Sequence, residues 1–308
     1  MTVLGLSAGN RDGSAEILLK AALRAAESDG AEVQLVRVDD LELSQGPHAA
    51  PDDGAWFWDR LMESEALIVS TPIYSRTVPG KLRLLGDKIA GPQADAGFTA
   101  EILRLRAAGQ AVPVPFAVDE RVLRPRVGGF IAVGGSEPAA WKTLALPLLH
   151  TLTFSMQLAV VDQVQFGGAG SPASITLDAG ALARAGELGR HVAAQRGRAF
   201  DDAEYRGDPG ACPLCHLDVI VLRPHGVECA TCGAHGHFEV GEEGVAVVFG
   251  PEGRARSVLT MGEKLAHFRE VQETAARQAP LRETIAERAA EFAAWDRVLR
   301  PSRAGATG

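Results

Sequence analysis

The chain opens with a short apolar run, a polar turn containing glycine, and an amphipathic stretch. Val3-Leu4-Gly5-Leu6 is typical of a buried strand, and the spacing of apolar residues over 15–26 predicts a helix. The turn between them would present free backbone N–H groups at a helix N-terminus, where the helix dipole favours an anion. Its candidate phosphate contacts are two hydroxyls, one guanidinium and two positions without a side chain: Ser7, Ser14, Arg11, Gly9 and Gly13. An ordinary strand–helix turn with a serine N-cap remains the alternative, because short glycine motifs are weakly specific.

Strands and helices alternate over the first 200 residues. Apolar or alternating runs predict strands at 3–6, 32–38, 66–70, 129–133 and 158–161, and helices at 15–26, 81–89 and 139–156 separate some of them. This order predicts an α/β fold with a five-stranded, doubly wound parallel sheet. In such a sheet ligands bind at the carboxyl ends of the strands. The loops after the first, third and fourth strands are rich in Gly, Ser, Thr or Tyr, and we expect them to meet there.

Three motifs carry a family resemblance over residues 1 to about 195. They are G-x-S-x-G-x-R-x-x-S from Gly5 to Ser14, T-P-x-Y from Thr71 to Tyr74, and the pair Gly134-Gly135. Together they resemble the NADPH-dependent FMN reductase family, whose fold is flavodoxin-like. The first motif has Gly9 where the family commonly has serine, and the turn is one residue shorter than usual, with Ala15 following. No dinucleotide fingerprint of the G-x-G-x-x-G type occurs in the turn, which favours a mononucleotide.

The resemblance implies an FMN site built from three loops. Ser7, Arg11 and Ser14 would hold the phosphate. The second loop would line the isoalloxazine, the third would close its other flank, and backbone N–H groups of 71–76 and 134–137 would bind its pyrimidine edge. The full set of implied cofactor-binding residues is Ser7, Gly9, Arg11, Gly13, Ser14, Ala15, Thr71, Pro72, Ile73, Tyr74, Ser75, Arg76, Gly134, Gly135 and Ser136.

The implied activity is that of an NAD(P)H-dependent flavin oxidoreductase. Hydride would pass from the nicotinamide to FMN and then to a small acceptor, such as a quinone, a nitro or azo compound, or free flavin, in a ping-pong reaction. FMN carries this chemistry, so no residue is predicted to be catalytic. The alternative is a flavin-binding electron carrier or redox sensor that docks a protein partner. Tyr74 could equally be a rim aromatic, and Arg76 a solvated charge rather than a ligand of the nicotinamide cofactor.

Four cysteines form a second motif beyond residue 200. Cys212-Pro-Leu-Cys215 and Cys229-Ala-Thr-Cys232 are two C-x-x-C pairs separated by 13 residues, which is typical of a zinc ribbon. Rubredoxin-like iron is the alternative, because both metals use such knuckles. An iron–sulfur cluster like that of related flavoproteins is disfavoured, since residues 41–53 contain no cysteine. Ten acidic residues against four arginines in 201–257 argue against nucleic acid as a partner.

We therefore expect a flavodoxin-like domain at 1–200, a four-cysteine zinc-ribbon-like module at 201–257 and a helical extension at 258–308. An insertion at 91–126 is expected beside the carboxyl ends of the strands, as a lid or an oligomer contact. The tail should form helices at 261–278 and 281–299 with apolar stripes, which predict a homodimer or larger homo-oligomer. A net charge of −8, no apolar run near the ~20 residues of a membrane span, and no targeting segment predict a cytoplasmic protein without a membrane partner.

Overall fold

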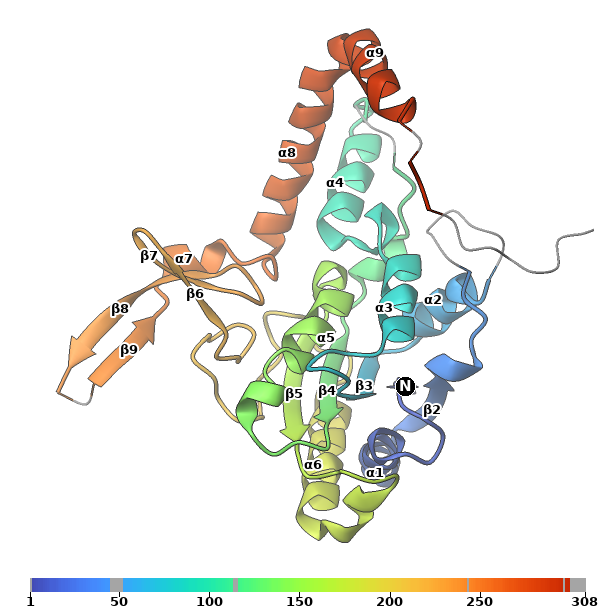
Figure 1. Cartoon of the computed structure of the whole chain (residues 1–308), viewed down its shortest axis with the longest axis vertical. Coiled ribbons are helices and arrows are strands. Elements are labelled where there is room, and N and C mark those ends of the chain that lie inside the picture. Colours follow the sequence, from blue (N-terminus) through green and yellow to red (C-terminus); the bar gives the residue numbers. More distant parts are fainter. Residues whose placement is uncertain (1, 45–51, 113–115, 243, 296, 300–308) are drawn as a thin grey trace, which may run out of the picture.

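A parallel five-stranded sheet forms the centre of the N-terminal part in a computed structural model, which describes residues 2–44, 52–112, 116–242, 244–295 and 297–299. The strands lie in the order β2-β1-β3-β4-β5, as expected for a flavodoxin-like fold (Figure 1). Their bounds are β1 Thr2–Ser7, β2 Glu32–Arg37, β3 Ala66–Pro72, β4 Val127–Val133 and β5 Ala159–Phe166. The predicted fold class is thereby confirmed.

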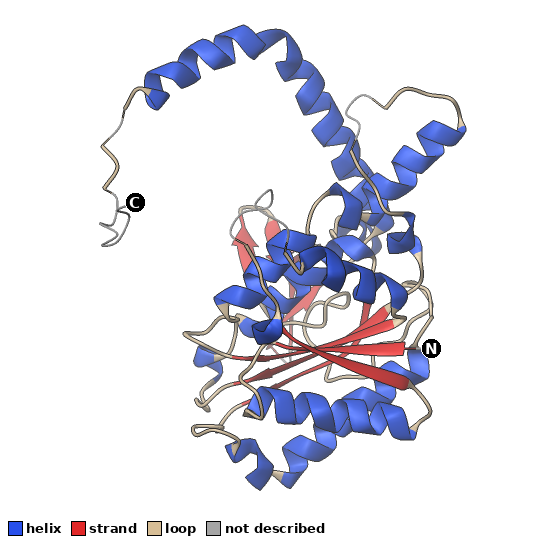
Figure 2. Ribbon diagram, turned by 90° about the vertical axis from the view of Figure 1, so that its right-hand side faces the viewer, coloured by secondary structure: helices blue, strands red, loops and turns tan. Residues whose placement is uncertain are grey.

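Helices cover both faces of the sheet, so alternate residues of the inner strands are buried on opposite sides. On one face, α1 (Ser14–Ser28) and α6 (Ala179–Gln195) pack against Val3, Ile68 and Ile131 (Figure 2). On the other face lie α2 (Gly54–Glu63), α3 (Gly80–Ile89) and α5 (Ala145–Thr153). Short 3-10 helices complete this part: η1 Val38–Asp40, η2 Pro92–Ala94, η3 Glu120–Leu123, η4 Ala139–Trp141, η5 Phe154–Met156 and η6 Ser174–Leu177.

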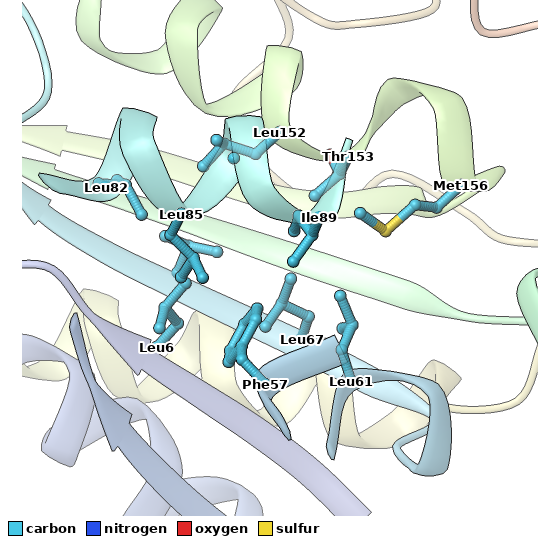
Figure 3. A pocket seen from close by; sticks show the side chains of 12 residues that line it. Leu6, Phe57, Leu61, Leu67, Leu82, Leu85, Ile89, Leu152, Thr153 and Met156 are labelled. Atoms are coloured by element: carbon cyan, nitrogen blue, oxygen red, sulfur yellow. The ribbon is translucent and has the colours of Figure 1, made fainter. Parts of the chain in front are cut away.

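The second face contains an apolar void that is too small for a ligand. Leu82, Leu85 and Ile89 of α3 point toward Phe57 and Leu61 of α2 across the strands (Figure 3). The space between them is about 10 Å³, roughly one water molecule at most, and its lining is almost wholly apolar. We interpret it as a packing defect of the core rather than a binding site.

The predicted helix at 139–156 is wrong in extent. Only Ala145–Thr153 is α-helical, between the 3-10 helices η4 and η5. Pro147 lies in the first turn of α5, where its missing N–H costs no hydrogen bond, whereas a longer helix would place it in the interior. At the other end Gln157 adopts a left-handed conformation (φ 56°), which stops the helix.

The insertion at 91–126 lies at the opposite edge of the sheet from the one expected. It connects the end of α3 to the start of β4, and such helix-to-strand connections run along the amino edge. Its main helix, α4 (Ala96–Ala107), packs against α8 (Met261–Gln278) through Phe98, Ile102 and Phe268. Figure 1 shows this pair at the top, while β4 and β5 point downward. Within one chain the described part of the insertion is therefore not a lid over the carboxyl edge.

The C-terminal part begins with an antiparallel sheet that lies within 201–257. Its strands occur in the order β6-β7-β8-β9, with bounds Ile220–Arg223, Gly226–Cys229, His235–Gly241 and Gly244–Val248. The helices α7 (Pro251–Ala255) and α8 follow, and the 3-10 helix η7 (Ala279–Leu281) joins α8 to α9 (Arg282–Ala293). α9 ends earlier than the predicted 299, and every residue in it is exposed. Figure 2 shows α8 and α9 as an arm that extends away from the sheet.

None of the described helices combines the length and the apolarity that crossing a bilayer demands.

Candidate functional site

Four loops at the carboxyl edge of the sheet surround a cavity of about 420 Å³, within the usual range of ligand pockets. They follow β1, β3, β4 and β5. The lining residues are Gly9, Asn10, Arg11, Asp12, Gly13, Ser14, Ala15, Pro72, Ile73, Tyr74, Val133, Gly134, Gly135, Ala169, Gly170, Ser171 and Pro172. The structure thus brings ten of the fifteen predicted cofactor residues to one cavity. Ser7, Thr71, Ser75, Arg76 and Ser136 do not line it.

The turn before α1 leaves its helix N-terminus open. Gly13 is the N-cap and offers no side chain to the first-turn N–H groups. By contrast, the side chains of Asp95, Asp178 and Thr260 cap α4, α6 and α8. The N–H groups of the first turn of α1 have no intrahelical acceptor, so they are available to an anion in the cavity. A Cβ on Gly9 would lie 3.0 Å from Ala15 Cβ, which shows how closely the turn is folded over the helix start.

The buried carboxylate of Glu16 stabilises this turn. Glu16 is fully buried, and its oxygens accept hydrogen bonds from Arg37 Nε at 2.7 Å and Nη2 at 3.0 Å. Lys20 Nζ lies 2.7 Å from Oε1, and the backbone N–H of Asp12 also donates to the carboxylate. These donors, Arg37 first, lower the pKa of Glu16 to about 2. Asp12 itself is held in the left-handed region at φ 58°, so Glu16 helps to fix an unusual loop conformation.

The predicted phosphate ligands differ in their surroundings. Arg11 is exposed, and its guanidinium makes a long ion pair of 3.5 Å with Asp40, so it can turn toward an anion. Ser14 lines the cavity at the start of α1. Ser7 is fully buried behind the turn, and its Oγ has no hydrogen-bond partner in the described chain. A ligand contact by Ser7 stays a prediction.

The loop after β3 folds into a tight hairpin at the mouth of the cavity. Tyr74 and Thr77 exchange two backbone hydrogen bonds of 2.9 Å each, and Ser75 and Arg76 form the turn with φ of 48° and 72°. The turn directs Ser75 and Arg76 away from the cavity, whereas Tyr74, half exposed, remains on its rim. Ile73 and Tyr74 already donate their N–H groups to Val133 O and Thr77 O. These two N–H groups therefore have acceptors already, and a contact of the remaining N–H groups of 71–76 and 134–137 with a pyrimidine edge stays a prediction.

The loop after β5 is the wall that the sequence analysis missed. Ala169, Gly170, Ser171 and Pro172 line the cavity beside Gly134 and Gly135. Residues 167–172 read Gly-Gly-Ala-Gly-Ser-Pro, a composition typical of a ligand-binding loop. This loop was not assigned to the carboxyl edge because the predicted last strand ends at 161, six residues before it. β5 continues to Phe166, and this extension brings the glycine-rich segment to the carboxyl edge.

The four cysteines form one buried cluster, as their spacing predicts. The thiol sulfurs all lie within 4.8 Å of one another, with Cys212–Cys232 at 3.5 Å and Cys215–Cys229 at 3.4 Å. Four sulfurs around a tetrahedral zinc ion lie about 3.8 Å apart, so the donor set fits a single ion without large movement. The cluster can therefore hold a metal ion.

The two cysteine knuckles have the same backbone geometry. In each, the residue after the second cysteine donates its N–H to the carbonyl of the first, at 2.9 Å for both His216→Cys212 and Gly233→Cys229. That residue has a positive φ, 57° at His216 and 71° at Gly233. His216 occupies a conformation that favours glycine, and its ring stacks on Tyr205 with centroids 3.6 Å apart.

A buried amide joins the metal-binding module to the sheet. Gln163 on β5 donates from Nε2 to the carbonyl of Cys215 at 2.7 Å. Its Oε1 lies 2.9 Å from His150 Nε2 on α5, so this nitrogen carries the proton. Burial lowers the pKa of His150 to about 4, which keeps the imidazole neutral.

Comparisons with known proteins agree with this geometry. The family model described as NADPH-dependent FMN reductase matches residues 1–171. Flavone synthase cfoJ of Aspergillus candidus is 34% identical over 295 residues, covering 89% of each chain. A solved flavone reductase matches with a TM-score of 0.82 at 26% identity, covering 98% of this chain and 100% of that one. The iron-sulfur flavoprotein MJ1083 of Methanocaldococcus jannaschii is 24% identical over 210 residues, covering 63% of this chain and 96% of that protein.

The family match spans more than half of the chain and contains the loops after β1, β3 and β4 and the first part of the loop after β5. Membership in a family of reductases favours the enzyme over the electron carrier that the sequence left open. The protein belongs to the NADPH-dependent FMN reductase family and is an NAD(P)H-dependent flavin oxidoreductase.

Proposed function

We propose that this oxidoreductase acts on a planar aromatic carbonyl compound of the flavone class. Two relatives that cover at least 89% of this chain are a flavone synthase and a flavone reductase, and their names supply the class. Quinones, nitro and azo compounds and free flavin remain acceptors to be compared with it. The observation that carries the proposal is a cavity with an open helix N-terminus at one end and walls of small residues at the other.

The residues around the cavity fit FMN. The first-turn N–H groups of α1 and the exposed Arg11 guanidinium match a phosphate. A Cβ on Gly134 would lie 3.4 Å from Ile73 Cβ, so the walls after β3 and β4 are in contact. Tyr74 on the rim can cover a bound ring and limit the entry of water. When bound, FMN supplies two-electron hydride transfer between nicotinamide and acceptor.

We further propose that the four-cysteine cluster holds zinc in a structural role. Zinc forms closed tetrahedral sites with four thiolates, and all four sulfurs here are buried with no open position for a substrate. The module has a small core of its own, so metal binding would supply much of its folding free energy. Iron in a rubredoxin-like site is the alternative for the same donor set.

We also propose a homodimer or larger homo-oligomer. Every residue of α9 is exposed in the described chain, and its exposed apolar side chains include Ile285 and Phe292, the latter 80% exposed. A second copy could cover them.

One preparation tests these proposals. The purified protein should show the visible absorption of bound flavin and contain about one zinc per chain by elemental analysis. Under anaerobic conditions it should oxidise NADH or NADPH in proportion to the flavone consumed. A protein with a full flavin complement that oxidises nicotinamide with quinones but never with flavone would refute the flavone class. Visible absorption from a ferric thiolate centre, with iron in place of zinc, would refute the metal assignment.

A further inference from the structure

The loop after β5 lies at the far end of the cavity from the phosphate turn. In the sheet order, β5 is three strands from β1, which corresponds to about 14 Å at ~4.8 Å per strand. Figure 1 shows β5 beside β4 at the edge of the sheet. A mononucleotide whose phosphate is held at the start of α1 would extend past the loops after β3 and β4, which leaves the loop after β5 as a wall that an acceptor can contact.

Hydrogen bonds fix this loop against the loop after β4. Gly134 donates its N–H to Phe166 O, and Ala169 donates to Gly134 O, both at 3.1 Å. A further hydrogen bond within the loop runs from Ser174 Oγ to Ser171 O at 2.8 Å. The position of the wall is thus set by the fold before any ligand binds.

Neither the backbone nor the packing requires glycine at position 170. Its φ lies outside the left-handed region, and a Cβ built on it meets no atom within 4 Å. Gly168 differs, since its φ of 73° does require glycine. A Cβ on Gly135 would lie 3.3 Å from Gly170 Cα, so the two loops are in contact while the other side of Gly170 is open. Because Gly170 also lines the cavity, the absence of a side chain there leaves room for the close approach of a ligand.

We infer that Gly170 is a specificity-determining residue whose bare backbone admits a planar acceptor of two or more rings. The inference rests on the proposed function, since it concerns the acceptor end of the same site. Ala169 and Ser171 on either side are also small, so the wall offers a flat surface rather than a pocket for a substituent. A one-ring acceptor would not need this space.

The variant Gly170→Leu tests the inference on the FMN-loaded enzyme. Two quantities are measured: the Kd of flavone by equilibrium dialysis, and kcat/KM for 1,4-benzoquinone with NAD(P)H. We expect the Kd of flavone to rise about tenfold or more and by a clearly larger factor than kcat/KM for benzoquinone falls, with the FMN content unchanged. Gly262→Leu is the matched control, because Gly262 on α8 also has no atom within 4 Å of its Cβ position and lies outside the cavity. It should alter neither quantity.

The inference is overturned if Gly170→Leu leaves the Kd of flavone unchanged, weakens both acceptors equally, or loses FMN. It is also overturned if the wild-type enzyme binds no flavone. A wild-type enzyme that binds flavone without reducing it refutes the proposed reaction alone, and the comparison of Kd values then still decides the role of Gly170.

Discussion

Replacing Glu16 with glutamine should destabilise the protein and loosen the turn before α1. The carboxylate is fully buried and accepts hydrogen bonds from Arg37 and from the N–H of Asp12, with Lys20 as a further ion-pair partner. A glutamine side chain at this position would keep the shape but lose the charge that these donors match. Because Asp12 belongs to the turn that lines the cavity, the variant should also retain FMN less tightly.

The size of the effect follows from the pKa. The environment lowers the pKa of Glu16 from its ordinary 4.5 to about 2. Since one pKa unit corresponds to ~1.4 kcal/mol, the ionised carboxylate contributes about 3 kcal/mol to the free energy of unfolding at neutral pH. A carboxylate with a lowered pKa stabilises the fold above its unfolded pKa, and this contribution disappears as the pH falls through the folded pKa. The difference between wild type and Glu16→Gln should therefore be largest above pH 4.5 and shrink to about half near pH ~3.

Denaturant titrations at several pH values, on protein freed of FMN so that ligand binding does not contribute, measure this difference. Asp119 also has a lowered pKa, of about 2, so wild type alone would lose stability from several groups on acidification. Subtracting the variant isolates Glu16. Glu27→Gln is the matched control, because Glu27 is an exposed residue of the same helix and should change stability little. A Glu16→Gln protein as stable as wild type at neutral pH, or a difference that does not shrink in acid, would refute this reasoning.

Three further predictions concern the other parts of the chain. The double variant Arg11→Ala, Ser14→Ala should lose flavin on gel filtration while remaining folded, because it removes phosphate hydrogen bonds worth roughly 1–3 kcal/mol each; a full flavin complement would contradict the site. Cys212→Ser or Cys232→Ser should remove the metal and make the surrounding module susceptible to protease; the parent's metal content by elemental analysis is the reference. Deleting 280–308 should shift the mass in light scattering toward the monomer, and an unchanged assembly would exclude the tail from the interface.

The layered fold could be predicted because its signals are local. Continuous apolar runs such as 66–70 mark strands buried on both faces, and helical spacing marks the segments between them. The predicted helix ends were wrong where a single residue determines the end of a helix. Pro147 and the left-handed Gln157 shorten α5, and neither effect is visible in the apolar pattern. The tail helix ends at Ala293 although apolar residues continue to 299, because apolar spacing alone does not set a helix end.

Part of the candidate site could be predicted because its motifs are also local signals in the sequence. Motifs placed three loops at the carboxyl edge, and ten of their residues line the cavity. The hairpin geometry that turns Ser75 and Arg76 away depends on two positive φ values in residues other than glycine, which sequence does not show. The insertion was assigned to the wrong edge, although topology alone determines it, since a segment that joins α3 to β4 must run along the amino edge.

The edge strand β5 connects the two functional parts of the molecule. An unpaired strand edge exposes backbone groups, and proteins cover such edges. Here the chain that leads into the first knuckle supplies the cover, as Arg206 donates its N–H to Val161 O at 2.7 Å and Gln163 binds the carbonyl of Cys215. The same strand ends at Phe166, directly before the wall that contains Gly170. Because one strand carries both contacts, the four-cysteine module and the loop that contains Gly170 share a support. We therefore expect a change at the cysteine cluster to alter β5 before it alters the turn after β1.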